Sequence, residues 1–147
     1  MKNQKVILYP LNIIESEKGN IRHIVDKNKK GFDSFSEAYI TEINPLDIKG
    51  WTLHKNKISN LIVVKGHVKF VFLISQNPEK FIVHELSSLE SKKDLYSRIC
   101  VQPNVWFAFQ GLHCKVSRVL NISNVLHSDT LSIRKDIKSF KYTWNRL

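Results

Sequence analysis

Hydrophobic and polar residues alternate with a period of two along much of the chain, and this pattern predicts β-strands. The segment SEAYITEI, residues 36–43, alternates clearly. Two β-rich runs, NLIVV and HVKFVFL, flank Lys65 and Gly66, which predicts a hairpin with a tight turn over residues 60–73. Further strands are expected at residues 5–9, 20–25, 81–86, 98–101, 106–110 and 115–122.

Turn residues separate these runs at short intervals, as in all-β sandwiches and barrels. Helical periodicity is sustained nowhere, although residues 87–96 fit one turn and residues 130–140 fit a short C-terminal helix or an extended arm. The chain has 147 residues, with no internal repeat and no linker. We therefore expect one domain over residues 1–147.

Composition is that of a globular protein, with 42% hydrophobic and 24% charged residues. Lysines interrupt the longest apolar run, residues 61–73, so no segment of about 20 apolar residues predicts a membrane span. The N-terminus lacks the features of a secretory signal, which favours a cytoplasmic protein. Cys100 and Cys114 have no partners at zinc spacing, so we expect two buried thiols.

A formal net charge of +10 favours an anionic partner, and nucleic acid, a membrane surface and a nucleoside diphosphate all carry that charge. The lysines are scattered, and the sequence has no helix-turn-helix pattern, zinc-finger spacing or aromatic RNA-binding motif. We therefore expect neither a nucleic-acid partner nor a membrane partner.

Three features are candidates for chemistry. His54, in KGWTLHK, is either a general base pointing into a barrel or an ordinary core histidine. Trp106 begins an aromatic run, WFAF, that is either a ligand-binding wall or simply core. Asp136, in RKDI, is either a surface ion-pair partner or a carboxylate that orients a histidine.

A metal site is not expected around His54. A metal site on a barrel strand needs a second histidine two residues away and a nearby glutamate, because a divalent ion requires three or four converging ligands. Thr52 and Asn56 occupy the flanking positions, and the next glutamate is Glu79. We predict neither a metal nor another cofactor.

The blocks KGWTLHK, LIVVKGHVKFVF, VQPNVWFAFQG, VLNIS and SIRKDI occur in the order found in dTDP-4-dehydrorhamnose 3,5-epimerases. The chain resembles a short, divergent branch of that family over roughly residues 17–144. The resemblance implies an all-β cupin jelly-roll barrel, also called a double-stranded β-helix, with no cofactor. It also implies a homodimer that exchanges N-terminal strands, residues 1–25, and we add that an unpaired strand KVILY would otherwise expose a sheet edge.

The family acts on nucleotide-linked 4-keto-6-deoxy sugars, and the resemblance gives His54 the role of base and Asp136 that of the carboxylate orienting it. This chemistry suits the residue types. A proton beside a ketone is acidic because the carbanion delocalises into an enolate, so a neutral imidazole removes it without a metal.

The sequence departs from the family pattern at three positions. Asn121 stands where standard members have the tyrosine that returns a proton, Trp51 replaces an arginine that contacts phosphate, and the lysine near the oxyanion becomes Ser59 or Asn60. Tyr142 or water is then the candidate acid, and a lysine is the candidate phosphate contact. The predicted substrate-binding residues are Lys18, Lys49, Trp51, Lys55, Asn60, Trp106, Asn121 and Tyr142.

The leading hypothesis is an epimerase acting at carbon 3, carbon 5 or both of a nucleotide-linked 4-keto deoxy sugar, for surface polysaccharide such as O-antigen or capsule. One alternative is a 3,4-ketoisomerase, which needs no acid on the opposite face but usually has a second histidine after the first. Another is a cupin that binds a nucleotide sugar without turning it over, which the loss of the acid at Asn121 favours.

Overall fold

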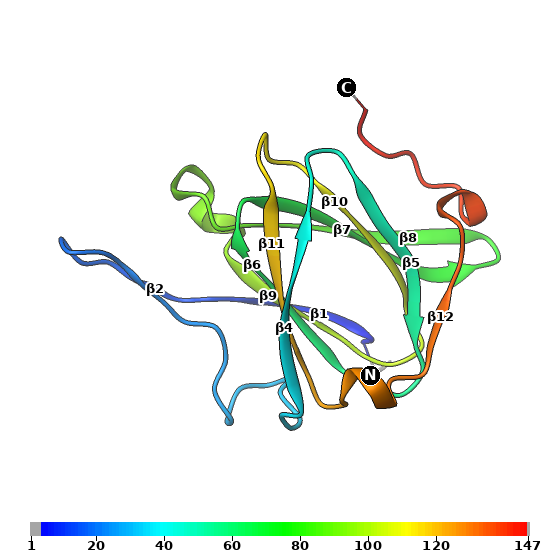
Figure 1. Ribbon diagram of the computed structural model, residues 1–147, viewed down its shortest axis with the longest axis horizontal. Coiled ribbons are helices and arrows are strands. Elements are labelled where there is room, and N and C mark those ends of the chain that lie inside the picture. Colours follow the sequence, from blue (N-terminus) through cyan, green and yellow to red (C-terminus); the bar gives the residue numbers. More distant parts are fainter. Residues whose placement is uncertain (1–3, 147) are drawn as a thin grey trace.

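The computed structural model describes residues 4–146 and is built mainly from two five-stranded antiparallel sheets (Figure 1). In spatial order, the first sheet contains β1 (Val6–Pro10), β9 (Ser97–Val101), β6 (Ser59–Lys65), β11 (Ser117–Ser123) and β4 (Glu37–Ile43). The second contains β12 (Ser132–Arg134), β5 (Ile48–His54), β10 (Trp106–Gly111), β7 (His67–Gln76) and β8 (Glu79–Ser87).

The remaining elements are short. A small hairpin of β2 (Ile13–Ile14) and β3 (Ile21–Arg22) projects from the body of the molecule (Figure 1). Three 3₁₀ turns complete the fold: η1 (Glu90–Leu95), η2 (His127–Asp129) and η3 (Ile137–Ser139). The C-terminal segment is therefore partly extended and partly helical.

The main core lies between the two sheets, because every second residue of each strand points inward. Val63 and Ile99 contribute from the first sheet, and Phe70, Phe72 and Phe107 contribute from the second. All five side chains are buried, and burying each stabilises the fold by about 1.5–3 kcal/mol. This confirms the all-β fold predicted from the alternation.

A second apolar cluster lies on the outer face of the second sheet, where the C-terminal segment covers it. Trp51 is fully buried there and packs edge-on against Phe140, with ring centroids 5.2 Å apart. Its indole Nε1 donates a hydrogen bond to the carbonyl of Ile137 at 3.1 Å. The C-terminal residues are thus part of the domain core.

An irregularity in the pairing of β5 with β10 determines which side chains share a face. Phe107 pairs with Thr52 but Ala108 pairs with Gly50, so Trp51 has no partner residue in β10. Such a bulge breaks strict alternation. Lys49 consequently faces the interior together with Thr52, while Trp51 faces outward.

The predicted hairpin over residues 60–73 is wrong. β6 pairs with β9 and β11 in the first sheet, whereas β7 pairs with β10 and β8 in the second. Gly66 is the corner where the chain crosses between sheets: its φ is 87°, and a Cβ there would lie 2.2 Å from Ser117 Oγ. A tight turn beside a glycine therefore does not by itself imply pairing of the flanking strands.

The N-terminal strand is not unpaired, because β1 pairs with β9 of its own chain. An unpaired first strand is therefore wrong as a reason for strand exchange. Exchange of residues 1–25, of which residues 1–3 lie outside the described part of the chain, stays a prediction. Cys100 is buried as expected, but Cys114 is exposed in the turn after β10. Within residues 4–146, no helix is long and apolar enough to cross a membrane.

Candidate functional site

A pocket of about 470 Å³ opens between the two sheets. Tyr39 lines it from β4 in the first sheet, and Lys49, Thr52 and His54 line it from β5 in the second. Phe107 and Phe109 of β10, His127 of η2 and Ser132 and Arg134 of β12 also line it. The pocket thus has polar and aromatic walls contributed by both sheets.

Ser132 positions His54. β12 runs antiparallel to β5 and pairs Ser132 directly with His54, so that Ser132 Oγ lies 2.7 Å from His54 Nδ1. The imidazole also lies beside Phe107, with ring centroids 5.8 Å apart. When Nδ1 carries the ring proton and donates a hydrogen bond to the serine oxygen, Nε2 has a free lone pair. A general base requires such a lone pair.

The surroundings keep His54 neutral. Burial is the largest cause, followed by the positive charges of Lys57 and Arg134 and the nearby His127, and together they lower the pKa of His54 from 6.5 to about 4. Removing water and adding like charge both disfavour the imidazolium form. At neutral pH the imidazole is therefore uncharged, with a proton on only one ring nitrogen.

A phenol, an amide and an ammonium meet on the opposite wall. Tyr39 pairs across the strands with Asn121 of β11, whose Nδ2 donates to Tyr39 Oη at 2.9 Å. Lys57 Nζ donates to the same oxygen at 3.0 Å. Both Asn121 and Lys57 are buried, so Tyr39 presents to the pocket a hydroxyl whose oxygen is held by two N–H donors.

The residues lining the pocket include Lys49 and Arg134 and no aspartate or glutamate. A concave site with charge of one sign concentrates ligands of the other sign. Phe107 and Phe109 add aromatic surface to the same pocket. The arrangement suits an anionic ligand that also carries a ring.

The predicted pairing of Asp136 with His54 is wrong. Lys135 exchanges backbone hydrogen bonds with Trp51, so the next residue, Asp136, lies opposite Gly50. Gly50 is four residues along β5 from His54, which places Asp136 about 13 Å from the strand position of His54. The carboxylate of Asp136 instead accepts the backbone N–H of Lys138 at 2.8 Å and caps η3.

Three aromatic residues predicted to bind substrate lie outside the pocket. Trp51, Trp106 and Tyr142 belong to the cluster on the outer face of the second sheet, beneath the C-terminal segment. The assignment of all three residues to substrate contact is therefore corrected, because their side chains lie on the face of the sheet away from the pocket. Of the aromatic run, only Phe107 and Phe109 line the pocket.

Three further predicted residues also lie elsewhere. Asn60 faces the outer side of the first sheet, where its amide donates to the carbonyl of Gly31. Lys18 lies in the exposed turn between β2 and β3, and Lys55 is exposed at the end of β5. Among the predicted binding residues, Lys49 lines the pocket and Asn121 contacts the lining residue Tyr39.

Sequence reasoning missed Tyr39, Ser132, Arg134 and His127. The sequence contains no clear signal for Tyr39, since apolar Ala38 and Ile40 occupy the other face of the predicted strand 36–43, although the structure exposes both. The other three are distant from His54 in sequence and reach it through the pairing of β12 or through η2. Within residues 4–146, no three His, Cys, Asp or Glu side chains are grouped as metal ligands.

Fold and pocket together define a cupin-type β protein with a cationic pocket that contains a histidine and a phenol. Comparison with protein-family models gives no match, and neither does comparison with curated proteins. Solved structures do match, and they include members of the epimerase family that the sequence resembles.

A dTDP-sugar isomerase from Desulfovibrio desulfuricans G20 superposes with a TM-score of 0.82 at 22% identity, covering 95% of this chain and 90% of that one. A mutant 3,4-ketoisomerase, QdtA from Thermoanaerobacterium thermosaccharolyticum, in complex with TDP-4-keto-6-deoxyglucose, gives 0.72 at 22%, covering 89% and 88%. The dTDP-4-dehydrorhamnose 3,5-epimerase from Sulfolobus tokodaii gives 0.76 at 14%, covering 97% and 83%. These likenesses confirm the cupin-type fold.

Proposed function

We propose that this chain is a nucleotide-sugar isomerase that moves a proton at a carbon beside the keto group of its substrate, with His54 as the base. The observation that carries the proposal is the position of a neutral histidine and a phenol in one cationic pocket. Solved structures with this fold include dTDP-sugar epimerases and a ketoisomerase bound to a TDP-linked keto sugar.

The substrate's diphosphate would lie near Lys49 and Arg134, which supply positive charge at the pocket. Its negative charge would offset the positive charge of Arg134, which is one of the cations that disfavour protonation of His54. Because a nearby anion stabilises the imidazolium, binding would raise the pKa of His54 and make it a stronger base. Substrate binding and activation of the base are thus coupled.

In the proposed step, His54 Nε2 removes the proton from the carbon beside the carbonyl, and the C–H electron pair moves into an enolate. Tyr39 then donates its hydroxyl proton to the opposite face of that carbon, which inverts the centre and leaves a phenolate. Lys57 and Asn121 donate hydrogen bonds to that oxygen and so stabilise the phenolate. Solvent returns the proton of the imidazolium to the tyrosine.

Epimerisation is the reaction that we favour, because Tyr39 and His54 come from facing sheets and approach a sugar from two sides. The second candidate is 3,4-keto isomerisation, in which the proton returns on the same face and the carbonyl moves. Asn121 favours it, since an amide is not a proton-transferring acid.

The test is incubation of TDP-, UDP- and GDP-linked 4-keto-6-deoxy sugars with the protein in deuterated water, followed by mass spectrometry and NMR. Epimerisation predicts one deuterium at the inverted carbon with the carbonyl still at carbon 4. A carbonyl moved to carbon 3 supports the ketoisomerase instead. Binding of all three sugars with neither deuterium incorporation nor movement of the carbonyl refutes both reactions and supports a non-catalytic binding protein.

Tyr39→Phe and Tyr142→Phe form a matched pair for the acid. We expect Tyr39→Phe to abolish inversion while proton exchange by His54 continues, because only the acid is lost. Tyr142→Phe alters a tyrosine in the outer cluster and should leave both rates unchanged. Equal losses in the two variants would contradict the role assigned to Tyr39.

A further inference from the structure

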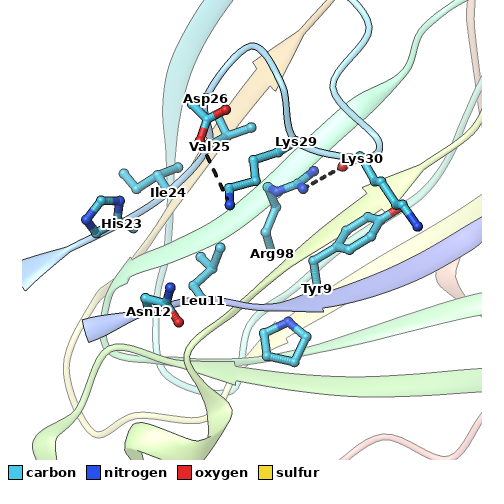
Figure 2. A pocket seen from close by; sticks show the side chains of 11 residues that line it. Tyr9, Leu11, Asn12, His23, Ile24, Val25, Asp26, Lys29, Lys30 and Arg98 are labelled. Atoms are coloured by element: carbon cyan, nitrogen blue, oxygen red, sulfur yellow. Dashed lines mark hydrogen bonds and ion pairs between the residues drawn. The ribbon is translucent and has the colours of Figure 1, made fainter. Parts of the chain in front are cut away.

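A second pocket, of about 430 Å³, lies on the outer face of the first sheet, on the side away from the main core (Figure 2). Tyr9 lines it from β1, Leu11 lines it from the segment that follows β1, and Arg98 lines it from β9. Residues 23–26, which follow the projecting hairpin, form the other wall together with Lys29 and Lys30. None of these residues lines the pocket that contains His54.

Arg98 is the unusual feature of this second pocket. Its neighbour Ile99 points into the main core, so Arg98 points outward, yet its side chain is only 2% exposed. The guanidinium donates hydrogen bonds to Lys30 O at 2.7 Å and to Asn60 Oδ1, both neutral oxygens. Within residues 4–146, Arg98 forms no ion pair with a carboxylate, and its Nε is buried without an acceptor.

A buried cation without an anion is destabilising, and loss of hydration lowers the pKa of Arg98. The pocket adds more positive charge, because Lys29 and Lys30 also line it. Among the described residues that line the pocket, the one carboxylate is that of Asp26. Its Oδ2 lies 4.0 Å from Lys29 Nζ, and it does not pair with Arg98. Positive charge therefore exceeds negative charge around a concave space.

The wall opposite β9 is packed closely. Gly31 has a φ of 80°, and a Cβ there would lie 2.9 Å from a ring carbon of Tyr9. The Tyr9 ring in turn lies 4.5 Å from the centre of the Arg98 guanidinium. The arginine is thus held between the Tyr9 ring, the backbone carbonyl of Lys30 and the side-chain amide of Asn60, in a site formed before any ligand arrives.

We propose that this outer pocket binds a phosphate-bearing small molecule, with Arg98 and Lys29 contacting the phosphate. A phosphate monoester carries between one and two negative charges near neutral pH and matches several cations better than a carboxylate does. The side chains of Leu11 and Ile24 supply apolar surface for the rest of the ligand. This site is separate from the pocket of His54, and the proposal does not depend on the proposed enzymatic activity.

The experiment is a titration of isotopically labelled protein with inorganic phosphate, followed by residue-resolved NMR. We expect saturable shifts of the backbone amide signals of Ile24, Lys29 and Lys30. Arg98→Met should weaken phosphate binding at these signals about tenfold or more, as expected for the loss of charge-assisted hydrogen bonds. Arg118→Met is the matched control, because Arg118 is an exposed arginine on the outer face of the same sheet, paired with Glu42.

Amide signals that do not move with phosphate, or an Arg98→Met variant that binds as wild type does, would overturn the proposal. Acetate titration tests the ligand class, since equal affinity for acetate would refute the preference for phosphate. If Arg98→Met does not fold, the exposed Lys29→Gln variant provides the test instead. It should weaken phosphate binding measurably, and unchanged affinity would count against the site.

Discussion

Ser132→Ala tests how His54 is oriented. The substitution removes the hydroxyl that lies 2.7 Å from His54 Nδ1 and leaves the exposed backbone of β12 in place. One neutral hydrogen bond contributes about 0.5–1.5 kcal/mol, so a loss expressed fully in the transition state slows proton exchange about 2- to 13-fold. Ser132→Thr retains a hydroxyl and should stay closer to wild type.

Asp136→Asn is the contrasting variant, because the resemblance assigns the orienting role to Asp136 whereas its carboxylate caps η3. We expect its exchange rate to stay within about twofold of wild type, since it removes no contact with His54. The assay is the initial rate of deuterium incorporation into a keto nucleotide sugar. A larger loss in Asp136→Asn than in Ser132→Ala would refute the assignment of Ser132. Nitrogen-15 chemical shifts of the His54 ring report the Nδ1–H tautomer independently of any substrate.

Three further predictions concern stability and assembly. The pKa values of His54 and His84 are lowered, so the unfolded chain binds more protons below pH 6.5 and stability falls from there toward pH 4. His54→Asn should reduce this loss in urea titrations at pH 7 and pH 5. Trp51→Ala should lower the free energy of unfolding by about 3–5 kcal/mol, because the indole is fully buried, and a loss below about 1 kcal/mol would contradict its structural role. Sedimentation at micromolar concentration should give a dimer of the 17.2 kDa chain, whereas a monomer would end the prediction of strand exchange.

The sequence predicted most strands, because alternation of polar and apolar residues directly reflects a sheet with one buried face. It could not assign strands to sheets. The run through Lys65 and Gly66 fits a hairpin locally, but the two strands it joins lie in different sheets. Pairing partners are long-range contacts, and nothing in the local pattern distinguishes a turn within a sheet from a corner between sheets.

Two residues of β5 illustrate the same limit at the site. Counting back from His54 by strict alternation places Trp51 on the opposite face, and the structure agrees, whereas the family resemblance placed Trp51 at the substrate. The same count places Lys49 outward, yet the bulge opposite Phe107 turns it into the pocket. A bulge depends on the neighbouring strand, so sequence alone does not reveal it.

The orienting residue shows how register decides function. Ser132 and Asp136 lie in one short segment, 78 and 82 positions after His54, and the pairing of β12 with β5 places only Ser132 against the imidazole. Because the apolar residues Ala38 and Ile40 lie on the other face of the strand, the alternation in residues 36–43 did not identify Tyr39 as an inward residue. Its role becomes visible only when Asn121, its partner across the sheet, brings an amide to its hydroxyl.

The most direct test of the central claim compares proton exchange in His54→Asn and His113→Asn. His54 lines the pocket with its imidazole neutral, whereas His113 lies in the turn after β10, outside that pocket. With a keto nucleotide sugar that the wild type exchanges in deuterated water, His54→Asn should bind the substrate but incorporate deuterium at least about a hundredfold more slowly, the contribution expected of a general base. His113→Asn should match the wild type. Exchange in His54→Asn at the wild-type rate would contradict the assignment of His54 as the base.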